Sequence, residues 1–182
     1  MARGGSSSKK RKAKRNRPSS HARLGKIFEG EVSSSLKIFK RQHPYSFYWH
    51  RLADTMTYIK VPNVIIPKQP CDYIALYEGK FFGLEAKSTN ADRFQLDYLK
   101  EHQKDGLKEI QYAGGKGFLI ISFRKTRPVT AFLIDILDYL PLERRAIQEE
   151  RKSIPREWIE ESGLSLKRIP RIGFDLSPLF LT

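Results

Sequence analysis

Asp72, Glu85 and Lys87 carry the strongest chemical signal in this chain, because two carboxylates and an amine occur there among apolar residues. Opposed carboxylates on adjacent strands repel each other, so a counter-charge must offset the repulsion. A cation such as Mg²⁺ is bound through one or two carboxylates and can activate one of the waters it keeps. Lys87 could then orient that water or neutralise charge that develops on a phosphate. The three residues therefore predict metal-assisted attack on a phosphate ester.

A β-hairpin must position these side chains. Two runs rich in aromatic and aliphatic residues flank Glu78-Gly79, a dipeptide with turn chemistry. A two-residue turn at that point sets Asp72 directly opposite Glu85. Lys87 lies two residues beyond Glu85 and so projects from the same face of the sheet.

The same residues have an alternative interpretation without catalysis, in which an Asp begins a strand beside an ordinary Glu-Lys pair on a surface. The catalytic interpretation is favoured because both strands carry apolar residues, and charges in buried strands need a compensating partner. The apolar residues expected in the core are Ile74, Leu76, Phe82, Leu84 and Ala86.

Length and charge restrict the class of protein to which this chain can belong. The chain has 182 residues, typical of one domain, and 40% of them are hydrophobic. We expect a disordered basic arm over residues 1–22 and a single domain over residues 23–182. The net charge is +14 and the first acidic residue is Glu29, so the expected partner is a polyanion, most simply nucleic acid. For the arm, a solubilising or localisation tail is the alternative.

Cysteine, histidine and hydropathy exclude several other classes. Cys71 is the only cysteine, which rules out an intramolecular disulfide and fits a reducing compartment. We interpret it as a small buried hydrophobe. The histidines lack metal-ligand spacing, so zinc is not expected. No apolar run approaches the ~20 residues of a membrane span, and no secretory signal follows the basic N-terminus. We therefore expect an intracellular, cytoplasmic protein without a membrane partner, acting at the nucleoid or in a phage-infected cell.

Around the hairpin, the hydrophobic pattern predicts an α/β protein with a mixed β-sheet flanked by helices. Apolar spacings of three and four predict a first helix, and on spacing alone Glu29 is a solvated charge at the edge of its buried stripe. Expected helices span residues 22–41, 93–113, 135–140, 142–152 and 153–163, with Pro141 as a break. Expected further strands span residues 45–51, 56–66, 116–123 and 129–134.

Several colinear motifs resemble those of the Holliday junction resolvases of the RecU type, within the PD-(D/E)xK nuclease superfamily, over residues 24–181. Cys71-Asp72-Tyr73 and Leu84-Glu85-Ala86-Lys87 resemble the family's aspartate strand and its Glu-Ala-Lys strand at the same separation. Gly25 followed by Glu29 resembles a first-helix motif whose glutamate assists the metal site. The other matching segments are Phe94-x-Leu96, His102-Gln103, Lys152-Ser153-Ile154 and Pro170-Arg171-Ile172.

This resemblance implies a restriction-endonuclease-like PD-(D/E)xK core and a structure-selective endodeoxyribonuclease. It would cut four-way junctions as a homodimer by paired, symmetric, Mg²⁺-dependent phosphodiester hydrolysis. Asp72 and Glu85, supported by Glu29, would hold one or two Mg²⁺ ions, for which Mn²⁺ can substitute. Lys87 would orient the attacking water or stabilise developing charge. Gln103 would orient the nucleophile or a metal-bound water, or is simply a residue of a helix face.

The resemblance also concerns how DNA is bound. No base-reading module is present in the sequence, so selectivity should come from shape and phosphate placement. Between Phe47 and Pro70 the chain is shorter than bacterial RecU proteins, in which a strand pair forms a stalk that enters the junction. The residues predicted to contact DNA are Arg15, Arg17, Arg23, Lys26, Arg51, Lys60 and Lys68.

Two alternatives stay open at this point. One is another nuclease of the same superfamily, acting on flaps, linear duplex or damaged DNA; junction-specific binding and paired nicks would distinguish the two. The other is a non-catalytic architectural DNA-binding protein. Asp72, Glu85 and Lys87 together argue against it, because a pure binder gains nothing from two carboxylates that face phosphates.

Overall fold

The structure is a computed structural model that describes residues 20–52, 68–125 and 127–181. Its helices are α1 Ser20–Gln42, η2 Leu96–Tyr98 (a 3-10 turn), α2 Glu101–Tyr112, α3 Ile136–Gln148, α4 Arg156–Ser162 and α5 Ser177–Phe180. Its strands are β1 Phe47–Arg51, β2 Tyr73–Tyr77, β3 Lys80–Thr89, β4 Arg93–Gln95, β5 Lys116–Phe123, β6 Thr130–Asp135, β7 Ser153–Pro155, β8 Leu164–Ser165, β9 Arg168–Ile169 and β10 Gly173–Phe174.

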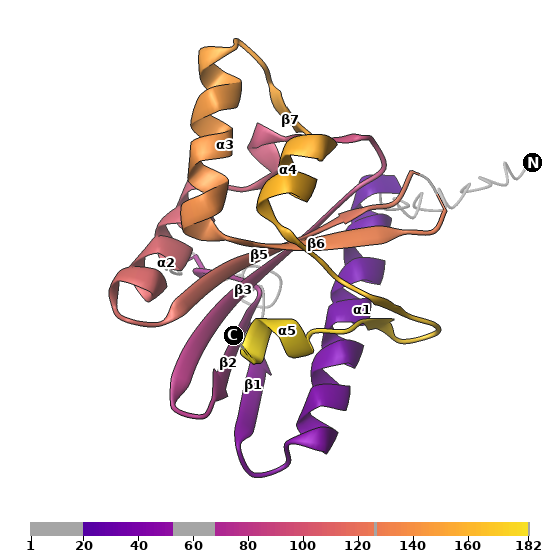
Figure 1. The fold of residues 1–182 in the computed structure, drawn as a ribbon, viewed down its shortest axis with the longest axis vertical. Coiled ribbons are helices and arrows are strands. Elements are labelled where there is room, and N and C mark those ends of the chain that lie inside the picture. The colour runs from indigo at the N-terminus through magenta and orange to yellow at the C-terminus, as the bar shows by residue number, and fades with distance from the viewer. Residues whose placement is uncertain (1–19, 53–67, 126, 182) are drawn as a thin grey trace, which may run out of the picture.

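A six-stranded mixed sheet with the order β1-β2-β3-β5-β6-β8 forms the centre of the molecule (Figure 1). β3 and β5 are parallel, whereas the other neighbours in this sheet are antiparallel. The predicted α/β architecture, a mixed sheet flanked by helices, is therefore confirmed. Most of the predicted basic arm and the strand expected over residues 56–66 lie outside the described residues, and residues 20–22 are part of α1.

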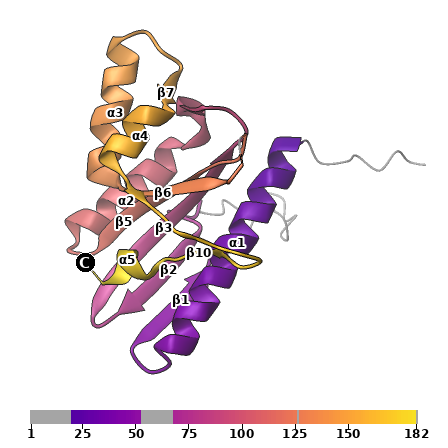
Figure 2. The same ribbon diagram turned by 45° about the vertical axis from the view of Figure 1, so that its right-hand side comes forward.

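The two faces of the sheet are covered differently, and each face has its own core (Figure 2). α1 packs on one face through a buried stripe at helical spacing, and β10 and α5 pack there too. α2, α3 and α4 cover the other face. The buried stripe of α1 comprises Phe28, Val32, Leu36 and Phe39.

The β2–β3 hairpin has the predicted register, with Tyr77 opposite Lys80 and Tyr73 opposite Leu84. Its turn residues Glu78 and Gly79 have φ angles of 48° and 80°, the left-handed conformation that two-residue hairpin turns require. Asp72 lies immediately before β2. The hairpin therefore delivers both carboxylates to one end of the sheet, as expected.

Two predicted helices have different structures. The first turns expected after Arg93 form β4 and η2 instead, and only α2 is helical. β4 pairs with β7, with Phe94 opposite Ile154, and both side chains are fully buried. This pairing joins segments about 60 residues apart, so no local pattern predicts it. For the same reason Ser153–Pro155 is a strand, and the last of the predicted helices begins only at Arg156 and ends before Gly163.

Pro141 does not break a helix, contrary to the prediction. α3 runs from Ile136 through Pro141 to Gln148, and its start is capped by Asp135, whose carboxylate accepts from the Leu137 amide at 2.8 Å. A proline early in a helix removes one backbone hydrogen bond. Burial of Ile136, Tyr139 and Ala146 against the sheet offsets that loss.

Gly106 fixes how closely α2 approaches the β2–β3 hairpin. A Cβ at this position would lie 2.4 Å from the Pro70 Cβ, so only glycine allows the helix to pack this closely. Pro70 belongs to the loop that leads into Asp72. None of the described helices is both long and apolar enough to cross a membrane.

Candidate active site

Glu85 is the most deeply buried charged residue of the site, with no exposed surface. Its Oε1 lies 2.7 Å from Lys87 Nζ and accepts a hydrogen bond from Gln103 Nε2 at 2.6 Å. Its Oε2 is also buried and has no hydrogen-bond partner among the described residues. One side of the carboxylate is thus held by protein groups, and the other retains free lone pairs.

Asp72 extends the pairing of β2 with β3 by one residue, through its backbone amide and its side-chain carboxylate. Its amide donates to the Leu84 oxygen at 3.1 Å, and its Oδ2 accepts from the Ala86 amide at 2.9 Å. These two bonds on either side of Glu85 fix the Asp72 carboxylate next to the Glu85 side chain. The two carboxylates predicted to be cross-strand neighbours therefore do come together.

Electrostatics at Glu85 favour an added positive charge. Burial, and secondly the nearby charge of Asp72, raise the pKa of Glu85 to about 8, although Lys87 opposes the shift. Without a further cation the site therefore holds more negative charge than its surroundings stabilise. A bound cation would restore the ionised form.

Glu29 reaches the same region from α1. Burial and the charge of Asp72 raise the pKa of Glu29, while Arg51, Lys87 and Lys26 lower it. The carboxylate forms an ion pair with Arg51 at the end of β1. The structure thus brings Glu29 within electrostatic reach of Asp72 and Lys87.

The backbone around Glu29 is anchored to the β2–β3 hairpin. The Tyr73 hydroxyl donates to the Glu29 carbonyl oxygen at 2.7 Å and lies 3.0 Å from Ser33 Oγ. Tyr73 is a fully buried residue of β2, one position after Asp72. This anchor explains how a helix residue far away in sequence is held beside the hairpin carboxylates.

The donor set fits a hard divalent cation. Within the part of the chain that the structure describes, no three His, Cys, Asp or Glu side chains lie close enough together to share one metal ion. Mg²⁺ needs only one or two carboxylates and keeps several waters. Asp72 and Glu85, with the free Oε2 of Glu85, meet that requirement. A supporting role of Glu29 stays a prediction, since its carboxylate contacts Arg51.

Gln103 links the start of α2 to the Glu85 carboxylate. Its Oε1 accepts from the Lys100 amide at 3.1 Å and so caps the helix. That bond fixes the orientation of the amide, so that Nε2 points to Glu85. Of the two interpretations of Gln103, contact with the site therefore describes the structure better than a free helix face.

A hollow of about 330 Å³ opens beside Lys87, between α1, the end of β3 and η2. Its lining residues are Gly25, Glu29, Ala86, Lys87, Ser88, Asp97, Tyr98 and Lys100. Ser88, Tyr98 and Lys100 carry no pattern in the sequence that predicts a place in the site. The last two fall in the segment predicted as one helix, whose first turns have another structure.

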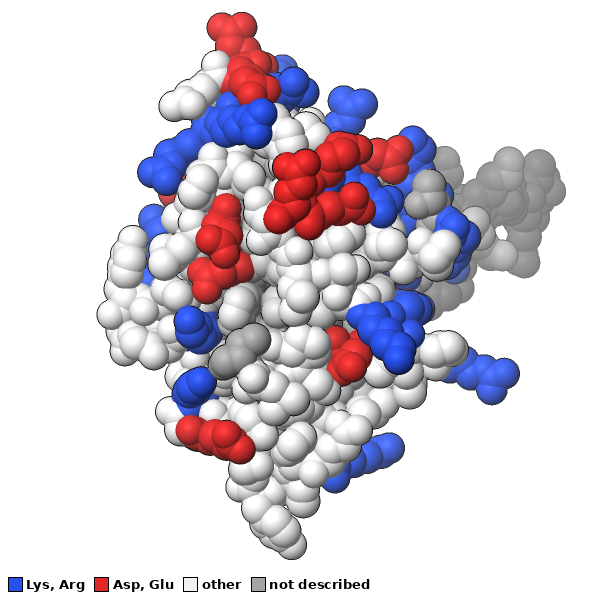
Figure 3. All heavy atoms as spheres, viewed as in Figure 1, with Lys and Arg blue, Asp and Glu red and all other residues white. Residues whose placement is uncertain are grey.

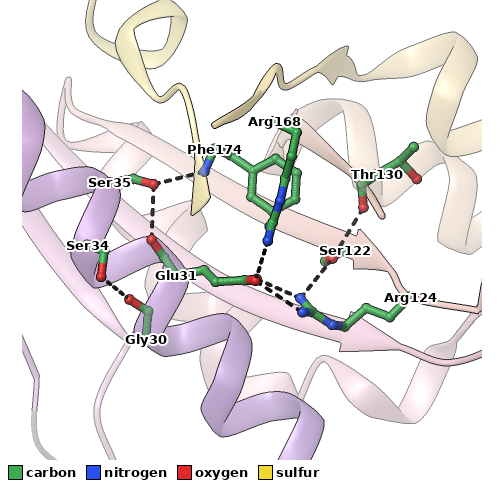
Figure 4. A network of polar contacts seen from close by, with 9 residues as sticks. All are labelled: Gly30, Glu31, Ser34, Ser35, Ser122, Arg124, Thr130, Arg168 and Phe174. Atoms are coloured by element: carbon green, nitrogen blue, oxygen red, sulfur yellow. Dashed lines mark hydrogen bonds and ion pairs between the residues drawn. The ribbon is translucent and has the colours of Figure 1, made fainter. Parts of the chain in front are cut away.

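α1 itself is fixed by a second charged cluster (Figure 4). Glu31 accepts from Arg124 at 2.7 and 3.2 Å and from Arg168 at 2.8 Å. Burial alone would raise the pKa of Glu31, but hydrogen bonds from Arg124 and Arg168 hold it below its ordinary value. Ser35 accepts from the Phe174 amide at 3.0 Å, which docks β10 on the same helix.

Some of the predicted DNA contacts surround the site. Arg51 and Lys26 lie close enough to Glu29 to lower its pKa. Burial lowers the pKa of His102 most, and the positive charges of Lys68 and Lys87 lower it further. Arg23 is exposed near the start of α1. Arg15, Arg17 and Lys60 lie outside the described residues.

The surface over α4 has the opposite character. Figure 3 shows acidic side chains gathered there, where Glu157, Glu160 and Glu161 are exposed. Phosphates are repelled by such a surface. We therefore do not expect DNA to lie over α4.

Comparison with known proteins identifies relatives of this chain. Residues 25–176 match the family model described as Recombination protein U. Holliday junction resolvase RecU of Ureaplasma parvum is 30% identical over 151 residues, which cover 80% of this chain and 84% of that protein. The RecU proteins of Pediococcus pentosaceus and Bacillus cytotoxicus are each 35% identical, over 53% and 59% of this chain. The chain spans about half the length of these two, 47% and 55%.

Among solved structures, Hjc of Archaeoglobus fulgidus, a Holliday junction resolvase, aligns with 73% of this chain and 93% of its own. The TM-score is 0.44 and the sequence identity is 15%.

Proposed function

This chain belongs to the Recombination protein U family, and we propose that it is a structure-selective endodeoxyribonuclease that resolves four-way DNA junctions. The observation that carries the proposal is the environment of Glu85. A fully buried carboxylate stands beside Asp72 and is held by Lys87 and Gln103, and one of its oxygens has no hydrogen-bond partner in the described part of the chain. Such a group destabilises the fold, so a chemical role is the better explanation for it.

Asp72 and Glu85 would hold Mg²⁺, and Mn²⁺ would substitute for it. When bound, such a cation lowers the pKa of a coordinated water and neutralises charge that develops on the phosphate. Glu29 would support the site once its carboxylate leaves Arg51. Oxygen-only ligands are consistent with this class of hard cation.

The chain's own groups orient the reaction. The Lys87 side chain is partly exposed, and its Nζ lies 2.7 Å from Glu85 Oε1, so the ammonium would donate both to Glu85 and to an oxygen outside the protein. In that position it would orient the attacking water or stabilise charge on the scissile phosphate. Gln103 would keep Glu85 in the orientation that presents Oε2, because its own amide is fixed by the helix cap.

We further propose that the active assembly is a homodimer. A four-way junction has two-fold geometry, and a two-fold symmetric dimer places two equivalent sites on it. Each subunit would then cut one strand. Lys26, Arg51 and Lys68 would contact phosphates around each site.

The test is cleavage of a labelled four-way junction and of a linear duplex with the same sequence, with Mg²⁺ present, by wild-type protein and by Asp72→Asn. Paired symmetric nicks in the junction alone, lost in the variant, are expected. Equal cutting of the junction and the duplex would contradict junction selectivity and indicate a nuclease of another specificity. Tight junction binding without cutting in Mg²⁺ or Mn²⁺ would indicate an architectural protein.

A further inference from the structure

The hollow between α1 and η2 lies directly beside the proposed catalytic groups, since Lys87 and Glu29 belong to its lining. Resting on the proposed nuclease function, we propose that this hollow receives one base of the strand being cut, next to the scissile phosphate. Gly25 keeps the hollow open, and Asp97 and Ser88 contribute to the choice of base. The hollow is thus a specificity-determining subsite.

The groups of the lining indicate how a nucleotide would lie. Two carboxylates, Glu29 and Asp97, and two lysines, Lys87 and Lys100, line the hollow, so its lining carries both signs of charge. With the phosphate at the ammonium of Lys87, beside the proposed catalytic carboxylates, the base is the part of the nucleotide that enters. Carboxylates accept hydrogen bonds from exocyclic amino groups of bases. We therefore expect a preference for an amino-bearing base over thymine at this position.

Ser88 provides an independent sign of a missing contact. It lines the hollow, yet its Oγ is buried and has no hydrogen-bond partner within the described part of the chain. Buried hydroxyl groups nearly always have a partner. Because the Oγ has almost no accessible surface, the Ser88 side chain would have to rotate toward the hollow, where a base edge or a sugar oxygen would supply that partner.

The size and walls of the hollow suit a single base. A volume of about 330 Å³ admits one nucleotide and excludes a duplex. The ring of Tyr98 forms one wall and is held edge-on by the buried Phe94, with ring centroids 5.6 Å apart. Lys100 Nζ donates to the Asp97 carbonyl oxygen at 2.6 Å, which places a second ammonium at the hollow. Unstacking a base costs least where pairing is already disturbed, as at a junction.

Gly25 explains why the hollow is not filled by α1. A Cβ at this position would meet no atom within 4 Å, so neither packing nor backbone geometry requires glycine there. Glycine is unfavourable in a helix interior, and alanine would be accommodated. Gly30, on the same helix, is equally free of neighbours but does not line the hollow. The two glycines thus form a matched pair for a test.

The experiment compares Gly25→Leu with Gly30→Leu in the full chain. Both should fold, with equal or higher thermal stability. For Gly25→Leu we expect kcat/KM for junction cleavage to fall by about tenfold or more, since misplacement of about 1 Å can cost ~100-fold. The preference for the base beside the cut should be lost, and Mn²⁺ affinity should not change. Gly30→Leu should match wild type in every measurement. Equal rates and equal cut positions for Gly25→Leu and wild type would overturn the proposal.

A second readout does not require cleavage. A junction with 2-aminopurine beside the cut position should gain fluorescence when wild-type protein binds in Ca²⁺, and should gain less with Gly25→Leu. If the wild-type protein binds the junction and unstacks the base but never cuts, the proposed nuclease function is contradicted and the base subsite is supported. A wild type that cuts without any fluorescence change would overturn the subsite alone.

If Gly25→Leu does not fold, Ser88→Ala tests the same proposal, with Ser34→Ala as its control. Ser34 is half-buried and its hydroxyl already donates to the Gly30 oxygen at 2.8 Å, in a bond within α1 that is open to solvent, so we expect its loss to leave cleavage and base preference unchanged. Ser88→Ala should weaken base discrimination at the cut and leave junction affinity unchanged. Unchanged discrimination would contradict the role of Ser88. Asp97→Asn should reduce the preference for an amino-bearing base, because an amide also offers a donor.

Discussion

Glu29 and Glu31 lie two residues apart on α1 but belong to charged clusters of opposite character. Around Glu31, two arginines occupy both oxygens of one carboxylate, and the pKa of Glu31 is lowered. Around Glu29, burial and Asp72 raise the pKa, as they do at Glu85. Of the two, the second cluster leaves a buried carboxylate oxygen, Oε2 of Glu85, without a hydrogen-bond partner among the residues that the structure describes.

The difference separates a structural cluster from the proposed catalytic one. Ion pairs that hold a fold together neutralise the charges they bury, because unpaired buried charge is costly, and Arg124 and Arg168 neutralise Glu31 in this way even though Arg168 Nη1 is buried without a hydrogen-bond partner among the described residues. A site that awaits a cation keeps an excess of carboxylates, which raises their pKa. The direction of the pKa shift, together with a free oxygen, is therefore more informative than the mere presence of buried charge. The predictions below test this contrast.

The largest expected effect is on cleavage by Asp72→Asn. The variant keeps an oxygen for the Ala86 amide but loses a carboxylate beside Glu85. Junction cleavage should fall by about 100- to 1,000-fold, the range found when one strong electrostatic contact of a transition state is removed. The free energy of unfolding should stay equal or rise, because repulsion of Glu85 is relieved. A variant that unfolds at lower denaturant concentration would indicate a structural role for Asp72.

Gln103→Leu should have an intermediate effect on cleavage. The substitution removes the hydrogen bond to Glu85 and part of the α2 cap. Partners that orient a metal ligand are typically worth about 10- to 100-fold in metal affinity or activity. Mn²⁺ titration should show weaker binding along with slower cutting. Slower cutting with unchanged Mn²⁺ affinity would instead place Gln103 in contact with the nucleophile.

Glu31→Gln should lower the free energy of unfolding and leave the rate of junction cleavage unchanged, the opposite of the result expected for Asp72→Asn. Removing one partner of a fully buried ion pair costs roughly 3–5 kcal/mol, and we expect about 2 kcal/mol here because the cluster is partly exposed. Arg124 is 9% exposed and Arg168 is 34% exposed. Urea unfolding and single-turnover cleavage measure the two effects separately. Glu149→Gln, in an exposed pair with Arg145 and Arg151, is the control and should change stability far less.

The stability difference between wild type and Glu31→Gln should depend on pH in the acid range. The pKa of Glu31 in the folded state lies below its ordinary value of 4.5. Its carboxylate therefore contributes stability fully above pH 4.5, and the contribution is lost as the pH falls through the folded pKa. Unfolding curves should show a constant difference from pH 7 to pH 5 and a shrinking one below about 4.5. A difference that grows on acidification would contradict the ion-pair assignment.

The smallest expected effect concerns Cys71, which is buried directly before Asp72 in the chain. Burial, with the charges of Glu85 and Asp72, raises the pKa of Cys71 to about 12, although hydrogen bonds at its sulfur oppose the shift. The thiol should therefore be unreactive toward a disulfide reagent at pH 8 and should react on unfolding. Rapid labelling of native protein would show that the hairpin opens readily.

The hairpin and the site could be predicted because their signals are local. The Glu78-Gly79 turn fixes the register, and the register sets Asp72 beside Glu85. Gln103 and Glu29 are predicted as site residues only from their resemblance to family motifs. Hydrophobic spacing alone places Glu29 at the solvated edge of its helix. Its proximity to Asp72 depends on the bond from Tyr73, which no local pattern contains.

The rest depends on contacts between distant segments. β4 forms because Phe94 and Ile154 are buried together, so a pattern that suggested one long helix was wrong there. Ser88, Tyr98 and Lys100 share a hollow with α1 only after that pairing places η2 beside it. Arg124 and Arg168 meet Glu31 across the whole domain, which charge counts along the sequence cannot reveal.

The central claim is that Asp72 and Glu85 hold the catalytic cation, and Mn²⁺-soaked crystals test it most directly. Anomalous scattering should reveal an ion bonded to the free oxygen of Glu85 and to Asp72, with no ion at the fully paired Glu31. An ion bound elsewhere, or none beside Glu85 at Mn²⁺ concentrations that support junction cutting, would contradict the account.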